Sequence, residues 1–218
     1  MQTLRLTAKD FKQSGSYWKD YIGPAIAEGF DGHVEIEGGL GYVKFVSLNV
    51  KGHIIAEAGT GIEAGEGIKA GWGIKAGWGI KAGWGIKAGW GIKAGWGIEA
   101  GWGIKAGEGI EAGWGIEAGT GIKAGEGIEA GWGIVSLYSW IKAKLKISIH
   151  AKCSISAGVF QTNGPQDVEA QEIDGKVAWG NVKILPKEEM KEEAKKESLS
   201  GKTIKLVIDG VEHEATIK

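Results

Sequence analysis

Residues 68–97 read IKAGWG five times in succession, and this stretch decides the fold. The hexapeptide recurs thirteen times between Ala56 and Gly133, with the consensus Ile-(Lys/Glu)-Ala-Gly-(Trp/Glu/Thr)-Gly. Exact repetition at a short fixed period indicates that one small unit is stacked on copies of itself. The sequence therefore predicts a repeat array in which only the charged slot and the Trp slot vary.

The repeat favours extended strands over a helix. Its even period keeps the alternation of an extended chain in phase from one copy to the next. A helix would carry two glycines per repeat, each costing about 1 kcal/mol relative to Ala, and six residues do not match a period of 3.6. Collagen would need Gly at every third position and abundant Pro, whereas this chain has three prolines. A β-solenoid, with rungs joined at glycine corners, fits the pattern.

The hexapeptide pattern resembles that of the left-handed parallel β-helix family, in which three six-residue faces form one triangular coil. The resemblance covers residues 56–134. In that family a small residue stands two positions before the aliphatic one, whereas here that position holds Trp, Glu or Thr and the small Ala follows. A slot that accepts both Trp and Glu is not fully buried, so we expect the Trp rings outside the coil at its corners.

Two cross-sections fit this spacing, with three or with two hexapeptides per turn. An eighteen-residue coil aligns the charged slots into columns, and one column holds only lysine: Lys69, Lys87, Lys105 and Lys123. The other two columns mix Lys with Glu. This distribution favours the three-sided coil, and a flatter coil of two hexapeptides per turn is the alternative.

The flanks of the array suggest three regions. We predict a mainly β protein with a small α/β N-terminal cap over 1–44, a parallel solenoid over 45–160 and a C-terminal hairpin, helix and hairpin over 161–218. After Ile134 the apolar alternation shifts by one, beginning at Val135, which implies a bulge or an altered corner.

Short turn and cap signals supply the detail within the terminal regions. Thr7–Asp10 suits a helix start with a capping box. Asp209-Gly210 between two apolar runs, Thr203–Ile208 and Val211–Ile217, is a strong hairpin signal, and Asp174-Gly175 is a weaker one. Pro186 opens a charged stretch that we expect to be helical through Leu199.

The bulk composition excludes several classes of function. Lys and Arg number 26 and Asp and Glu 27, so the net charge of −1 gives no global field and nucleic-acid binding is not expected. The single Cys153 allows no internal disulfide, and no apolar run has the length of a signal peptide core or a membrane span. We therefore expect a cytoplasmic protein, in the host cell if the protein is encoded by a phage.

Histidine is where catalysis would be sought, because the left-handed β-helix family includes acyltransferases with a catalytic His and carbonic anhydrases with three His on zinc. The four histidines, His33, His53, His150 and His213, all lie outside the array. Their spacing supports no zinc site, and the sequence has no P-loop or nucleophile-elbow motif. We expect a protein that is not an enzyme, with no catalytic residues, no metal site and no cofactor.

Two sets of residues are candidates for binding a partner. Tryptophan fills its slot in eight repeats, and the aromatic surface concentrated at Trp72, Trp78, Trp84, Trp90, Trp96 and Trp102 is a candidate contact ridge for another protein or for self-association. The alternative is that stacked rings only shield the corners and add order. Lys142, Lys144 and Lys146 form a local basic patch.

These observations favour a non-enzymatic binding protein with a rigid solenoid surface. The phrases Lys9–Lys12 and Ile208–Glu212 resemble those of uncharacterised phage and prophage accessory proteins. That resemblance implies a phage or mobile-element protein that binds or inhibits a host macromolecular complex, for example a defence system. A self-assembling structural protein is the alternative, and a hexapeptide-repeat acyltransferase is the third. Since eight Trp rings and a charge of −1 favour association, we also expect a closed homo-oligomer.

Overall fold

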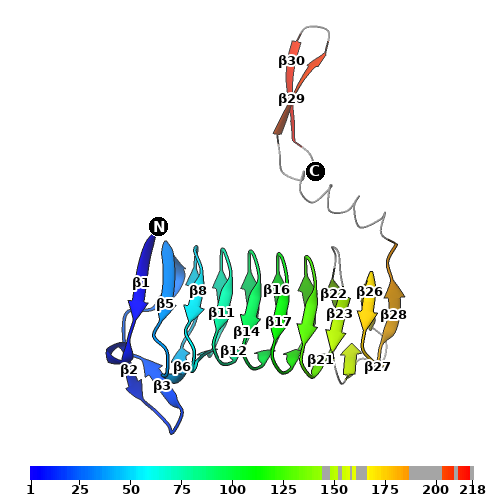
Figure 1. The fold of residues 1–218 in the computed structure, drawn as a ribbon. Helices are drawn as coiled ribbons and strands as arrows, with labels where there is room; N and C mark the ends of the chain where they lie inside the picture. Colours follow the sequence, from blue (N-terminus) through cyan, green and yellow to red (C-terminus); the bar gives the residue numbers. More distant parts are fainter. Residues whose placement is uncertain are drawn as a thin grey trace.

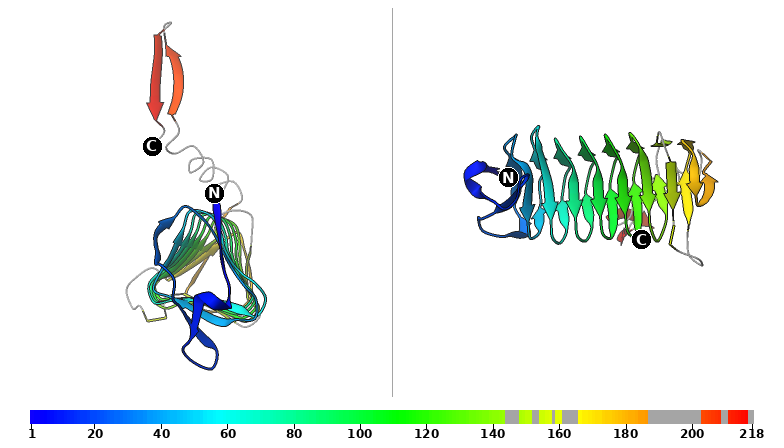
Figure 2. Two further views of the ribbon diagram at one scale, coloured as in Figure 1. Left: turned by 90° about the vertical axis from the view of Figure 1, so that its left-hand side faces the viewer. Right: turned by 90° about the horizontal axis from the view of Figure 1, so that it is seen from below.

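The fold is a parallel β-solenoid with three long faces (Figure 1). A computed structural model describes residues 1–143, 148–151, 154–157, 159–160, 166–186, 203–208 and 211–216. The strands of each face pair in parallel, except for the antiparallel pair β2–β3. Viewed along its axis, the coil is triangular (Figure 2, left).

The three faces consist of strands that recur once per coil. Face A contains β1 (Gln2–Leu6), β5 (Gly32–Ile36), β8 (Ile54–Ala56), β11 (Ile74–Ala76), β14 (Ile92–Ala94), β17 (Ile110–Ala112), β20 (Ile128–Ala130), β23 (Ser148–Ala151) and β26 (Glu172–Asp174). Face B contains β2 (Phe11–Gln13), β3 (Trp18–Tyr21), β6 (Gly41–Phe45), β9 (Thr60–Ala64), β12 (Ile80–Ala82), β15 (Ile98–Ala100), β18 (Ile116–Ala118), β21 (Gly133–Ser136), β24 (Ser154–Ala157) and β27 (Val177–Trp179). Face C contains β4 (Ile26–Phe30), β7 (Leu48–Val50), β10 (Ile68–Ala70), β13 (Ile86–Ala88), β16 (Gly103–Ala106), β19 (Gly121–Ala124), β22 (Ile141–Ala143), β25 (Asp167–Ala170) and β28 (Asn181–Ile184).

The register confirms the eighteen-residue coil. On face C Ile68 lies beside Ile86, and Ile86 lies beside Ile104, so three hexapeptides complete one turn. The alternative of two hexapeptides per turn is therefore wrong. An in-register stack places identical side chains about 4.8 Å apart along the axis.

Isoleucine and alanine fill the interior. Each Ile of the repeat from Ile62 to Ile134 is at most 2 % exposed, and each Ala from Ala64 to Ala130 at most 3 %. Burying one such isoleucine contributes about 1.5–3 kcal/mol relative to leaving it in water. The alternation that places Ile and Ala inside puts the intervening Lys or Glu outside.

The glycines of the array are needed because the backbones of successive coils approach closely, and not because the chain adopts unusual dihedral angles. From Gly61 to Gly133 no glycine has a positive φ, so these corners do not use left-handed backbone. The glycine before the Trp slot instead faces the coil below: a Cβ at Gly83 would overlap the carbonyl oxygen of Gly65. Any larger residue there would push successive coils apart.

The solenoid begins close to the N-terminus. Strands β1 and β3 to β6 join the three faces, so residues 1–44 supply coils as well as the terminal β2–β3 hairpin. The predicted helix start is one 3-10 turn, Ala8–Asp10. The backbone N–H of Thr7 donates to the Asp10 carboxylate at 2.7 Å, as a capping box requires.

The shift after the array is an enlarged corner. Ile122 lies beside Ile141, an offset of 141 − 122 = 19 residues instead of 18. The predicted inward placement of Val135 is wrong, because Ile134 and Ser136 keep the phase of the repeat and are buried, while Val135 lies in the outward column beside Glu117. The additional residue therefore comes after Ser136.

The C-terminal predictions have mixed outcomes. Asp174-Gly175 is a solenoid corner between β26 and β27, not a hairpin, since these strands belong to faces A and B and pair in parallel with the preceding coil. The other hairpin is confirmed, with β29 (Thr203–Ile208) antiparallel to β30 (Val211–Thr216). Apart from Pro186, the stretch predicted to be helical lies outside the described residues. In the described part of the chain, no helix has the length and apolarity to cross a membrane.

Candidate binding surfaces

The Trp slots form columns along the three corners of the coil. The chain runs from face C to face A through Trp72, from face A to face B through Trp78, and from face B to face C through Trp84. We call these the C/A, A/B and B/C corners. The eighteen-residue coil aligns Trp72 with Trp90, and Trp84 with Trp102. The A/B corner has the longest column: Trp78, Trp96, Trp114 and Trp132.

The rings of each column stack on one another outside the core. Trp78 and Trp96 have ring centroids 4.8 Å apart and planes 8° apart. Further along the same corner the separations widen to 6.2 Å at Trp114 and 6.4 Å at Trp132. Trp114 and Trp132 are 63 % and 64 % exposed. The outward placement predicted from the Trp/Glu/Thr slot is therefore correct.

The six tryptophans selected from the sequence do not form one ridge. The structure divides them into three stacked pairs, one on each corner: Trp72 with Trp90, Trp78 with Trp96, and Trp84 with Trp102. Trp114 and Trp132, which were not selected, extend the pair on the A/B corner. The eighteen-residue spacing is the signal in the sequence that could have found them. It assigns each tryptophan to its corner, whereas proximity along the chain groups tryptophans from different corners.

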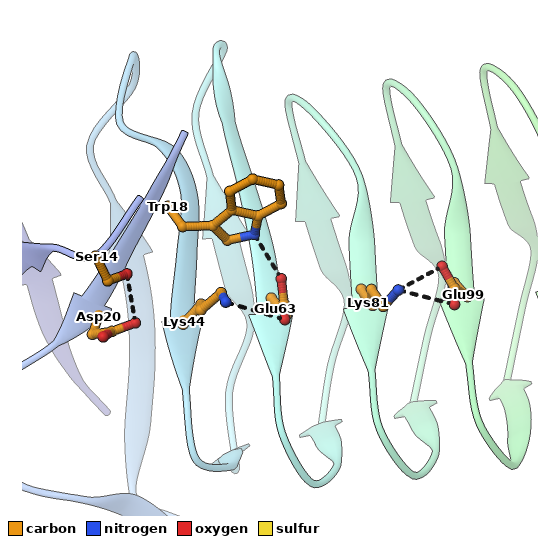
Figure 3. A network of polar contacts seen from close by, with 7 residues as sticks. All are labelled: Ser14, Trp18, Asp20, Lys44, Glu63, Lys81 and Glu99. Atoms are coloured by element: carbon orange, nitrogen blue, oxygen red, sulfur yellow. Dashed lines mark hydrogen bonds and ion pairs between the residues drawn. The ribbon is translucent and has the colours of Figure 1, made fainter. Parts of the chain in front are cut away.

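The charged slots of faces A and B mix Lys with Glu, and each face contains an ion pair between neighbouring coils of the array. On face A Lys93 Nζ lies 2.7 Å from Glu111 Oε1 in the next coil. On face B Lys81 Nζ lies 3.0 Å from Glu99 Oε1, and the hydrogen bond to Glu99 raises the pKa of Lys81 (Figure 3). Towards the N-terminus Glu63 accepts from the Trp18 indole N–H at 2.9 Å and pairs with Lys44 at 3.7 Å (Figure 3). Each of these faces therefore alternates between ion pairs and neighbours of like charge, since Glu99 also lies beside Glu117 and Glu111 beside Glu129.

Face C differs, because its charged slots hold a run of lysines. Lys69, Lys87, Lys105 and Lys123 lie in register, and the run continues to Lys142. Lys142 Nζ makes an ion pair with Glu169 in the next coil at 2.6 Å. The structure thus joins the lysine column of the array to Lys142 of the predicted basic patch, whereas Lys144 and Lys146 lie outside the described residues. We call Lys69, Lys87, Lys105, Lys123 and Lys142 the lysine column.

A shallow groove runs along each face between its aromatic corner and its charged column. On face C the groove is lined by Trp84 and Trp102, by lysines of the column, and by glycines such as Gly85 and Gly103. These glycines precede each Ile, and having no side chain they leave the floor open. The same construction recurs on faces A and B with mixed charges along the wall.

Two of the histidines, His33 and His53, meet on face A. The rings of His33 and His53 stack with centroids 4.0 Å apart, and the His53 backbone N–H donates to His33 Nδ1 at 3.1 Å. Burial, and then the neighbouring His53, lower the pKa of His33. Glu35 Oε1 lies 3.7 Å from His53 Nε2, and Trp72 contacts both rings. The pair thus begins the aromatic column of the C/A corner.

The remaining histidines lie on two other strands. His150 lies on β23 in register with Glu129 and Asp174, and His213 lies on β30. Among the described residues, no group of three His, Cys, Asp or Glu side chains could hold a metal ion. The chain matches no protein-family model, no curated protein and no solved structure. Its function is therefore inferred from the chemistry of its own surfaces.

Proposed function

We propose that the chain is a non-enzymatic binding protein that presents a rigid solenoid surface to a protein partner. The observation that supports this proposal is the aromatic column of the A/B corner, Trp78, Trp96, Trp114 and Trp132, in which Trp78 is half-buried and the other three rings are exposed. Four coils at about 4.8 Å per coil make an aromatic strip about 14 Å long from the first residue to the last. Tryptophan is among the residues that most often dominate the energy of protein–protein contacts.

The scaffold suits this role because little order is lost when it binds. Its strands pair in register with the coils above and below, and the isoleucine columns beneath them are buried. Stacked rings are held by their neighbours before any partner arrives. A preorganised surface of this kind loses less conformational entropy on association than a flexible one.

A more specific version of the proposal makes the partner a host macromolecular complex that a phage or mobile-element protein inhibits, as in evasion of a defence system. It is supported by the resemblance of the terminal phrases Lys9–Lys12 and Ile208–Glu212 to phage accessory proteins. In this version the protein acts in the host cytoplasm.

Self-association is the second candidate, and it is favoured by the repetition of the same patch. Every corner carries at least one exposed Trp pair, so a contact that suits one coil is available to the next. The net charge of −1 offers little repulsion between copies. A closed dimer or trimer would bury these rings without forming fibres.

Paired variants test both candidates. Thr occupies the same slot at Thr120, so Trp114→Thr with Trp132→Thr removes exposed rings from the A/B corner without introducing a foreign residue. Trp72→Thr with Trp90→Thr is the matched control on the C/A corner. Wild type and both variants are compared by sedimentation velocity and as baits against lysate of a candidate host.

The outcomes separate the two candidates. A stoichiometric partner that the A/B variant loses and the control retains supports the proposed contact. An oligomer that the A/B variant alone dissociates supports self-association. A monomer with no specific partner, or a partner retained equally by both variants, would overturn the assignment to this corner.

A further inference from the structure

The lysine column of face C is the longest run of like charge in the array, whereas the columns of faces A and B change sign after at most two residues. Identical charges directly opposite each other on neighbouring strands are destabilising. The repeat accepts Glu in the same slot, as Glu99 on face B and Glu111 on face A show, and those faces form ion pairs. Face C nevertheless keeps Lys69, Lys87 and Lys105 in register. Stability of the fold does not account for this choice.

These three lysines are available to a ligand. All three are exposed, and within the described part of the chain none of them makes an ion pair. The parallel stack holds their Cα atoms in a straight row about 4.8 Å apart. From Lys69 to Lys105 the row of unpaired lysines spans two coil spacings, about 10 Å. An extended, regularly charged anion complements this geometry.

The aromatic wall beside the row adds a second kind of contact. Trp84 and Trp102 line the same groove, and they are 51 % and 61 % exposed. The slots above and below this pair hold Glu66 and Thr120, so the outer ring faces of the pair are not covered by a further Trp. The glycine floor between rings and lysines leaves room for a chain lying along the axis.

We propose that the groove of face C binds single-stranded nucleic acid, with phosphates on Lys69, Lys87 and Lys105 and bases against Trp84 and Trp102. A cationic groove with aromatic rings beside it is the arrangement by which proteins bind single strands without sequence preference. An acidic polypeptide would use the lysines but gains no base stacking from the rings. The expectation of no nucleic-acid binding rested on the net charge of the whole chain. That sum cancels the lysines of face C against the carboxylates of the other faces.

The groove favours one strand over a duplex. The neighbouring faces expose Glu99 and Glu117 on face B and Glu111 and Glu129 on face A. These carboxylates repel a polyanion wide enough to reach around the corners. A single strand that lies within one face avoids them.

Fluorescence anisotropy of labelled oligothymidylate with the full chain tests the proposal. The test variant is Lys87→Gln with Lys105→Gln, and the matched control is Lys75→Gln with Lys93→Gln, which removes the same charge from the same slots of face A. We expect wild type to bind a strand of about 12 nucleotides at low salt, the test variant to bind at least about tenfold more weakly, and its log–log salt slope to shrink by about 1.4. The control should change the dissociation constant less than about twofold, since screening limits the reach of exposed charges.

Two further measurements keep the proposal falsifiable. Trp102→Thr should weaken binding severalfold, whereas Trp114→Thr on the A/B corner should leave it unchanged, which also separates this site from the proposed protein contact. Circular dichroism checks that every variant keeps its strands. No binding at low salt, equal losses for test and control, or tighter binding of polyglutamate than of oligothymidylate to face C would overturn the proposal.

Discussion

Lys87 and Lys105 lie directly opposite each other on face C, in the same register that pairs Lys93 with Glu111 on face A. The residue in the charged slot therefore decides whether two neighbouring coils attract or repel each other at that position. Because these groups are exposed, solvent and salt reduce the free energy at stake to less than about 1 kcal/mol per pair.

Replacing Lys105 by Glu should stabilise the protein. The new carboxylate would face both Lys87 and Lys123, and we expect a gain of about 0.5 kcal/mol, or about 1–2 °C in the melting temperature, at low salt. Lys81→Glu on face B is the control with the opposite sign, because Lys81 lies between Glu63 and Glu99 and the substitution places like charges on both sides. Melting followed by circular dichroism measures both. A Lys105→Glu protein that melts lower than wild type at low salt would contradict the electrostatic account.

Two glycines of one repeat should respond very differently to substitution. A Cβ at Gly107 would overlap the carbonyl oxygen of Gly89 in the coil below, whereas a Cβ at Gly109 would lie 3.7 Å from the carbonyl oxygen of Gly127. We expect Gly107→Ala to cost at least about 2 kcal/mol, as overpacking does, and Gly109→Ala to cost less than about 0.5 kcal/mol. Urea unfolding measures both values. Similar values for the two variants would show that the coils adjust their spacing freely.

Much of this fold could be predicted from the hexapeptide alone. An even period with Ile and Ala in fixed phase predicts strands with those residues inside, and the lysine-only column indicates eighteen residues per coil. The corner at Asp174-Gly175 was missed because Asp-Gly suits any tight change of direction, and only strand pairing distinguishes a hairpin from a corner. Local signals specify that the chain turns but not which strand it meets next.

The candidate binding surfaces could be predicted less well from the sequence than the fold. Grouping Trp72 to Trp102 by proximity in sequence merged residues that lie on three different corners. Sequence reasoning does not connect Lys142 with Lys123 and the other lysines of the column, because the enlarged corner after Ser136 breaks the eighteen-residue count that would align them. A net charge of −1 also conceals a face whose column is all lysine over five coils.

The stability of the N-terminal coils should depend on the protonation of His33. Its pKa is lowered, chiefly by burial, so the folded protein favours the neutral ring that accepts the His53 N–H. The folded state then binds fewer protons than the unfolded state. The stability that the neutral ring contributes is therefore fully present above the unfolded pKa of about 6.5 and is lost as the pH falls below it. We expect the melting temperature to decline from pH 7 towards about pH 5, and to decline less in His33→Asn, whose amide oxygen can accept the same bond. An identical pH dependence in the two proteins would exclude His33 as its source.

The last prediction concerns the energy held in the Trp columns. Trp96 stacks on two rings, Trp78 at 4.8 Å and Trp114 at 6.2 Å, whereas Trp90 stacks on Trp72 alone at 5.1 Å. Each stacked pair is worth about 0.5–1.5 kcal/mol, so Trp96→Thr should cost about twice as much as Trp90→Thr. Threonine already occupies this slot at Thr120, so neither change introduces a residue that the corner cannot hold. Urea unfolding gives the two costs, and near-ultraviolet circular dichroism reports the lost ring coupling. Equal costs for the two substitutions would mean that the rings contribute only by covering the corner backbone beneath them, and not by stacking on one another.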